Sequence, residues 1–150
     1  MIFLRIAVVD GQGGGFGKHI ITRLRQELPA EVEILALGTN AAATVAMLKA
    51  GANEGATGER AIIYNAPRVD VITGCLTIII ADAMLGELTP AMATAIASSP
   101  ARKFLLPFNR AGVEMIGVVS EPLPHLISFL ADRLKVFYEG FAPREAHRDE

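Results

Sequence analysis

The chain has 150 residues, of which 51% are hydrophobic and 20% charged, and its formal net charge is −2. This length predicts one domain that can bury a sizeable core, and the slightly negative charge gives no electrostatic basis for binding nucleic acid. The single cysteine excludes internal disulfides and a cysteine-based zinc cage, so we expect no metal and a reducing, cytoplasmic location.

The chain begins with a strand, a glycine loop and a helix. Residues 1–5 carry no charged region ahead of an apolar run, so we expect no signal peptide. No apolar run reaches the roughly 18–20 residues of a membrane span, so we expect no membrane partner. Residues 3–9 are apolar on both faces, as in a buried parallel strand. Five glycines follow within residues 11–17, and residues 17–28 place apolar side chains at helical spacing.

The glycine loop predicts an anion site. A backbone with few Cβ atoms lets a ligand approach closely, and the following helix directs free N–H groups and its positive dipole end toward an anion. Gly11 and Gly13 fit the dinucleotide pattern G-x-G-x-x-G, but Phe16 occupies the third glycine position and Gly17 follows one residue later. The alternative is a tight turn without a ligand. To separate the two, we expect Gly14→Val to fold and to lose the ligand.

The end of the loop resembles a different phosphate site only in part. Gly17-Lys18 matches the end of a nucleoside-triphosphate loop, but His19 replaces the Ser or Thr that holds magnesium. Triphosphate hydrolysis is therefore not expected. Lys18 is either a phosphate contact or a solvated lysine of the first helical turn.

The second strand ends in a polar sequence. Residues 32–37 predict this strand, and residues 41–50 predict the next helix. Between them lie Gly38, Thr39 and Asn40, where a dinucleotide site normally carries an acid for the ribose hydroxyls. The missing acid puts an ordinary NAD site in doubt. Thr39 and Asn40 either bind a ribose or phosphate or simply cap the helix.

The middle of the chain continues the alternation of helices and strands. Residues 55–59 predict a loop, residues 60–65 a short helix, and residues 69–73 the third strand, with Gly74 and Cys75 at its end. Residues 78–85 predict a buried helix, with a strand as the alternative, and Asp82 within them is either a core carboxylate or a site residue. Thr89 and Pro90 then begin a helix that runs to about residue 98.

The last third predicts two strands and a helix. Residues 103–107 form the fourth strand and residues 113–119 the fifth. Their connection of about five residues is too short for a parallel crossover, so the fifth strand should be an antiparallel edge. Residues 122–137 predict the last helix, and residues 139–150 a polar, flexible tail. Residues 1–138 therefore form the single domain.

The fold class expected is α/β, a three-layer Rossmann-like sandwich with a mostly parallel sheet of about five strands and an antiparallel edge. Ligands in such sheets bind at the carboxyl ends of the strands, where residues 10–18, 38–40, 73–77 and 107–110 converge. The candidate binding residues are Asp10, Gly11, Gln12, Gly13, Gly14, Gly15, Phe16, Gly17, Lys18, Gly38, Thr39, Asn40, Gly74 and Cys75.

Four stretches resemble an uncharacterised bacterial family, domain-of-unknown-function family 3842, whose members are short stand-alone Rossmann-like proteins. They are residues 9–14, 37–41, 47–52 and 83–93, with the sequences VDGQGG, LGTNA, MLKAGA and AMLGELTPAMA. The resemblance implies no activity and transfers no catalytic residue. Related proteins carry a cysteine where this chain has Ala111 or Gly112, which argues against an essential thiol there.

These features support three hypotheses. The first is a protein that binds a nucleotide, dinucleotide or other phosphate-bearing ligand through residues 11–17, with NAD(P) or another nucleotide as candidate cofactor. The second is a homo-oligomeric regulatory or scaffold protein without a small ligand, suggested by the apolar residues 75–88 and the last helix. The third is an enzyme that uses Lys18 and Asp10 on a phosphorylated small molecule. The pattern names no catalytic residue and assigns no role to Asp82, Glu87 or Asn109.

Overall fold

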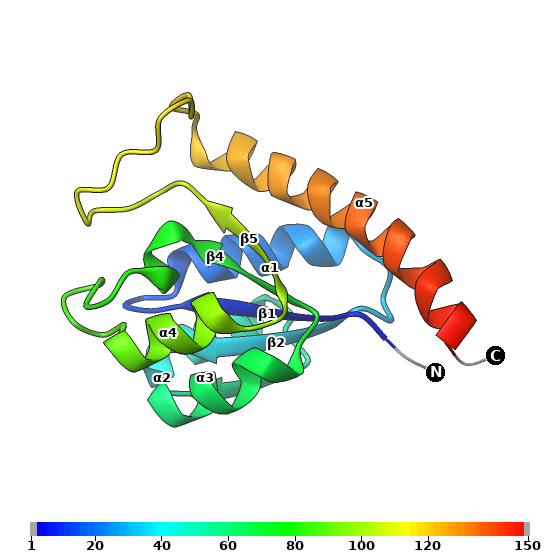
Figure 1. Cartoon of the computed structure of the whole chain (residues 1–150), viewed down its shortest axis with the longest axis horizontal. Coiled ribbons are helices and arrows are strands. Elements are labelled where there is room, and N and C mark those ends of the chain that lie inside the picture. The colour runs from blue at the N-terminus through cyan, green and yellow to red at the C-terminus, as the bar shows by residue number, and fades with distance from the viewer. Residues whose placement is uncertain (1–2, 149–150) are drawn as a thin grey trace.

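The computed structural model describes residues 3–148, with side chains for residues 3–141. The strands are β1 (Arg5–Asp10), β2 (Glu33–Gly38), β3 (Glu54–Thr57), β4 (Val71–Cys75) and β5 (Arg102–Leu106). The helices are α1 (Gly15–Glu27), α2 (Ala41–Ala50), α3 (Glu59–Asn65), α4 (Pro90–Ser98) and α5 (Leu123–Arg148), with short 3-10 turns η1 (Ala66–Arg68) and η2 (Leu76–Ile79) (Figure 1).

All five strands form one parallel sheet in the order β3-β2-β1-β4-β5. The α/β class and the number of strands are as predicted, but the antiparallel edge strand is wrong. Residues 113–119 are not a strand, because they are exposed and bend through a turn in which the Val118 N–H donates to the Met115 carbonyl at 3.3 Å. β3 was not predicted, since its four residues are mostly exposed and show no apolar alternation.

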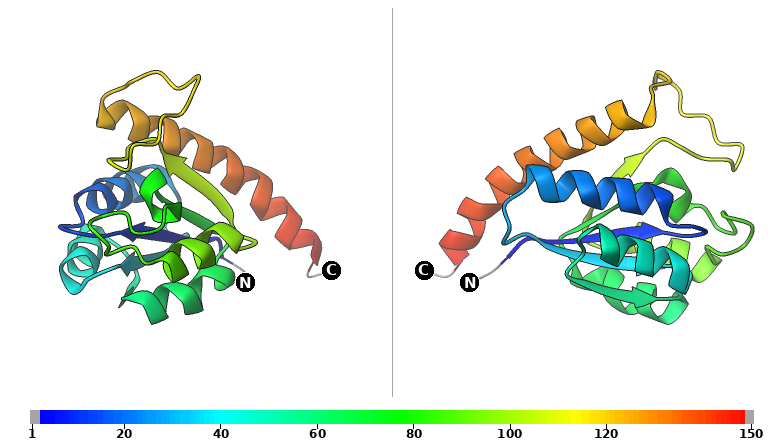
Figure 2. Two further views of the ribbon diagram at one scale, coloured as in Figure 1. Left: turned by 60° about the vertical axis from the view of Figure 1, so that its left-hand side comes forward. Right: turned by 180° about the vertical axis from the view of Figure 1, so that it is seen from behind.

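Helices cover both faces of the sheet (Figures 1 and 2). Because successive strand residues point to opposite faces, β1 divides its side chains between two cores. Ile6 and Val8 pack with α1, α2 and α5, while Ala7 and Val9 pack with α3 and α4. Burial on both faces explains why β1, β2 and β4 read as continuous apolar runs.

Local capping chemistry fixes two helix starts where they were predicted. The Asn40 side chain accepts from the Ala43 N–H at the start of α2, and the Thr89 side chain accepts from the Met92 N–H at the start of α4. Both are standard N-cap contacts. Both helices have the bounds expected from the sequence.

Two helix predictions need correction. Residues 78–85 are not a helix, because η2 ends at Ile79 and the chain then bends through turns with positive φ at Asp82, Met84 and Leu85. Asp82 is exposed there and is not a core carboxylate. The predicted end of the last helix at residue 137 is too early, since α5 continues to Arg148. The flexible tail expected for residues 139–150 stays a prediction, and residues 149–150 lie outside the described part of the chain.

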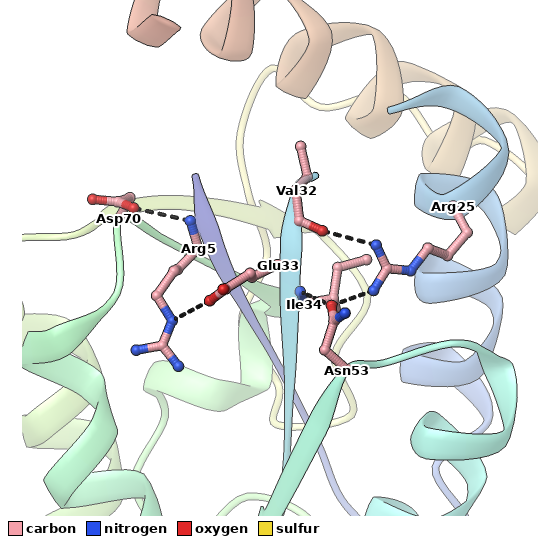
Figure 3. Close-up of polar contacts among 7 residues, drawn as sticks. All are labelled: Arg5, Arg25, Val32, Glu33, Ile34, Asn53 and Asp70. Carbon is pink, nitrogen blue, oxygen red and sulfur yellow. Dashed lines mark hydrogen bonds and ion pairs between the residues drawn. The ribbon is translucent and has the colours of Figure 1, made fainter. Parts of the chain in front are cut away.

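Arg25 joins three elements at the amino-terminal edge of the sheet (Figure 3). From α1 its guanidinium donates to the Gly51 carbonyl at 2.7 Å, to the Val32 carbonyl at 2.8 Å and to Asn53 Oδ1. Asn53 Oδ1 also accepts from the Ile34 N–H at 2.8 Å. This edge is therefore fixed by polar contacts, and the loops of the opposite, carboxyl-terminal edge form the candidate site.

Candidate functional site

Asp10 is the internal anchor of the glycine loop. It ends β1 and is only 6% exposed. One carboxylate oxygen accepts from the Gly11 N–H at 2.8 Å, and the other accepts from the Gly17 N–H at 2.7 Å. Burial raises the pKa of Asp10, and the bonds from Gly17 and Gly11 partly oppose that rise. The carboxylate thus holds the first turn of α1 from inside, and both of its oxygens accept from backbone N–H groups of the loop.

The glycines of the loop serve different purposes. A Cβ at Gly14 would lie 2.8 Å from Ala43 Cα, and a Cβ at Gly17 would strike Met47, so these two let α1 pack closely on α2. Gly14 also has φ +75°, a conformation that favours glycine. Gly13 and Gly15 differ, because a Cβ at either position would meet nothing within 4 Å. Only the latter two present bare backbone to open space.

Three hydrogen-bond donors converge on one oxygen of Glu87. Glu87 Oε1 accepts from the Gln12 N–H at 3.0 Å, from Thr39 Oγ1 at 2.8 Å and from Asn40 Nδ2 at 2.6 Å. Asn40 Nδ2 also donates to the Gln12 carbonyl at 3.0 Å, which ties the loop after β1 to the loop after β2. The bond from Gln12 is the main cause that lowers the pKa of Glu87, with help from Thr39 and Asn40. The site therefore already holds an anionic oxygen, supplied by the chain itself.

Glu87 is carried by a bent segment, residues 80–88, which we call the strap. The strap connects η2 to α4 and packs through the buried side chains of Ala83 and Leu88. Its Met84 covers the glycine loop, since a Cβ at Gly11 would lie 2.6 Å from Met84 Sδ. Leu85 is 98% exposed. The strap thus lies over the loop after β1, held there by the buried side chains of Ala83 and Leu88 and by the Glu87 carboxylate.

The family described as Domain of unknown function (DUF3842) matches residues 5–139. This chain belongs to the DUF3842 family. The match runs from β1 into α5 and so includes every residue of the candidate site described above. No curated protein and no solved structure matches the chain.

In this DUF3842 protein the end of β4 lies beside the end of β1. A Cβ at Gly74 would lie 2.6 Å from the Val9 carbonyl oxygen, so glycine is required for the close approach of the two strands. Cys75 is buried, and burial together with the charge of Asp10 raises the pKa of its thiol to about 12. A thiol with this pKa stays protonated at neutral pH and is a poor nucleophile.

The other predicted residues lie at the outer edge of the candidate site. Lys18 and His19 are exposed on the first turns of α1. Phe16 contacts Phe108 with ring centroids 5.6 Å apart, which brings the loop after β5 to the glycine loop as expected. Asn109 is used locally, where its side chain donates to the Val113 carbonyl at 2.8 Å.

Glu87 was not expected at the site from the sequence of this DUF3842 chain. It lies 75 positions from Gln12, and spacing along the chain gives no sign of their contact. The one available signal was an acid in the turn that follows the strand beside β1.

Among the described residues, no group of three or more His, Cys, Asp or Glu side chains is arranged to hold a metal ion. In the same part of the chain, no helix combines the length and apolar character needed to cross a bilayer.

Proposed function

We propose that this protein binds a nucleotide or another phosphate-bearing ligand at the carboxyl-terminal edge of the sheet. In the bound state a phosphate oxygen takes the position that Glu87 Oε1 holds in the structure. The observation that carries this proposal is the convergence of Gln12 N–H, Thr39 Oγ1 and Asn40 Nδ2 on that single oxygen. Carboxylate and phosphate oxygens are both anionic acceptors, so one set of donors suits either.

The arrangement of the sheet supports the location. The strand order 3-2-1-4-5, with helices on both faces, supports a three-layer Rossmann-like sandwich. Such sheets bind ligands where the strand order reverses, which here is between β1 and β4. The glycine loop follows β1 and the strap follows β4, so both flank this position.

The residues present fit a phosphate group better than they fit the ribose of NAD. Gly13 and Gly15 leave open space in which a phosphate can approach the backbone. At the end of β2, where an NAD site normally carries an acid, the chain has Thr39 and Asn40, which are donors. Phosphate recognition is therefore the shared chemistry, with NAD(P) and mononucleotides as the first ligands to test. A cytoplasmic location, expected from the single cysteine, belongs to the same proposal.

An enzyme built on Asp10 and Lys18 gains no support from this geometry. Both carboxylate oxygens of Asp10 face backbone N–H groups of the loop, and Lys18 is on the exposed surface of α1. The proposal is therefore one of binding. The oligomeric alternative has separate support, described in the next subsection.

A thermal-shift screen with NAD, NADP, FMN, ATP and inorganic phosphate tests the proposal. A ligand at 100 times its dissociation constant should add about 2.7 kcal/mol of stability. Thr39→Val removes one donor and keeps the size, so it should reduce the shift, whereas Thr94→Val on the exposed side of α4 should not. If no ligand at millimolar concentration stabilises either wild type or Glu87→Ala, the proposal is wrong.

A further inference from the structure

Residues 113–119, with the sequence VEMIGVV, form an apolar segment that faces solvent; we call it the exposed segment. Its large apolar side chains are 41–90% exposed: Val113, Met115, Ile116, Val118 and Val119. Its hydrogen bonds are local, from Asn109 to Val113 and from Val118 to Met115. A run of large apolar residues that the described part of the chain leaves exposed is typical of an interaction surface.

The outer edge of β5 is also without a partner strand in the described chain. β5 ends the sheet and pairs only with β4. A hollow of about 190 Å³ lies against it, lined by residues 104–107 and, from α5, by Leu126, Phe129, Leu130 and Arg133. Since neighbouring strand residues point to opposite faces, a hollow lined by three successive residues of β5 (104–106) lies along the edge of the strand. This groove thus combines free backbone hydrogen-bonding groups with an apolar wall.

The groove and the exposed segment complement each other in charge. Arg133 is the one charged residue among those that line the groove, and Glu114 is the one charged residue in the exposed segment. In an extended strand, Ile116 and Val118 lie on the same face as Glu114. One face of the segment would therefore present an acid and two β-branched side chains to a groove with one base and apolar walls.

We propose that the groove of one copy binds the exposed segment of a second copy, as a strand added to the edge of β5. Each copy carries both a groove and a segment, and in the proposed arrangement both pairs form between the same two copies, which closes a twofold dimer. One-way pairing would instead build a ring or a filament. Between β5 and α5 the chain loops outward from its own sheet (Figure 1), which leaves the segment free to reach a neighbour. In this dimer Glu114 lies against Arg133 of the second copy, and the apolar residues are covered.

Sedimentation velocity at micromolar concentration gives the first test. Wild type should have twice the 16.0 kDa mass of the chain. Ile116→Asp places a charge on the buried face of the added strand and should give a monomer. Val45→Asp is the matched control, because Val45 is also an exposed apolar residue but lies on α2, beside the other end of the sheet. A wild-type monomer, or an Ile116→Asp dimer, would overturn the proposal.

A charge exchange shows which copy supplies the segment. Glu114→Arg and Arg133→Glu each place like charges together twice in the dimer, so each should raise the dissociation constant at least fivefold. In a heterodimer of the two variants, the introduced arginine faces the introduced glutamate at one contact, and the native Glu114 faces the native Arg133 at the other. Mixing the variants should therefore restore wild-type affinity. If the segment folded onto its own β5, mixing would restore nothing, and the second-copy assignment would be wrong.

Discussion

Glu87 Oε1 lies 2.6 Å from Asn40 Nδ2, although the two residues are 47 positions apart in the sequence. The contact crosses the carboxyl-terminal edge of the sheet and joins the strap to the loop after β2. Asn40 also caps α2, because its Oδ1 atom accepts from the Ala43 N–H. This bond orients the Asn40 amide independently of Glu87. The Asn40 amide is thus held in place by the fold, and the carboxylate that it contacts comes from the strap.

Removal of the Glu87 carboxylate should strengthen ligand binding. Hydrogen bonds to a charged group contribute roughly 1.5–3 kcal/mol, and a ligand that displaces Glu87 must replace them. Glu87→Ala removes this competition, so we expect about tenfold tighter binding of phosphate or ADP by calorimetry. Glu87→Gln keeps a neutral acceptor and should lie between Ala and wild type. Weaker binding by Glu87→Ala would instead make Glu87 a direct contact of the ligand.

The strap should also respond to acid. The pKa of Glu87 is lowered from 4.5 in the folded protein, mainly by the bond from Gln12. Its contribution to stability is therefore present above pH 4.5 and is lost as the pH falls through the lowered folded pKa. Urea unfolding should show a gap in stability between wild type and Glu87→Gln at about pH 7 that narrows at about pH 3.5.

Asp10 gives an effect of opposite sign. Its pKa is raised in the folded state, so its ionisation lowers stability as the pH rises through the interval above 3.8. This contribution is present in both proteins and largely cancels in their difference. An unchanged gap between the two pH values would show that Glu87 does not hold the strap by charge.

The parts of the fold that depend on local physics could be predicted from the sequence. Asn40 and Thr89 cap helices whose bounds were correct, and the apolar runs of β1, β2 and β4 follow from burial on both faces. β3 could not be predicted from its own short, polar sequence. It becomes a strand because it pairs with its parallel neighbour β2 at the edge of the sheet. Residues 113–119 show the converse: their β-prone composition does not make a strand without a partner to pair with.

The candidate site was predictable only as a set of loops. Parallel strands bring their carboxyl ends together, and this placed Gln12, Thr39 and Asn40 at one edge correctly. The different roles of the loop glycines and the position of Glu87 at the site depend on packing across the sheet. This packing joins residues that are far apart in the chain. No pattern of spacing reports such contacts.

Arg25 should matter for stability and not for ligand binding. It makes three bonds at the amino-terminal edge of the sheet, of which Figure 3 shows those to Val32 and Asn53. The glycine loop lies at the opposite edge, where β1 ends. Arg25→Ala leaves the carbonyls of Val32 and Gly51 without their donor, and should cost roughly 1.5–3 kcal/mol in urea unfolding. Arg25→Lys should recover little of this, because one ammonium group cannot span three acceptors. If Arg25→Ala changes the ligand affinity under conditions in which the variant is fully folded, the two edges of the sheet are not independent.

Substitutions at the neighbouring glycines Gly14 and Gly15 distinguish the role of the loop in packing from its role in binding. From the sequence we expected Gly14→Val to fold and to lose the ligand. The structure revises this, because Gly14 has φ +75° and a Cβ there would lie 2.8 Å from Ala43 Cα. Backbone strain of about 1–3 kcal/mol and overpacking of similar size should destabilise the protein strongly, against a typical stability of about 5–15 kcal/mol.

Gly15→Val is therefore the sharper variant. Gly15 begins α1, is exposed, and has open space where its Cβ would be. Valine suits a helix slightly better than glycine, so the variant should be at least as stable as wild type in urea. Its branched side chain would fill the space where a phosphate approaches the loop, so calorimetry with ADP should show at least tenfold weaker binding. Full affinity in Gly15→Val would mean that the ligand does not approach the protein through the glycine loop.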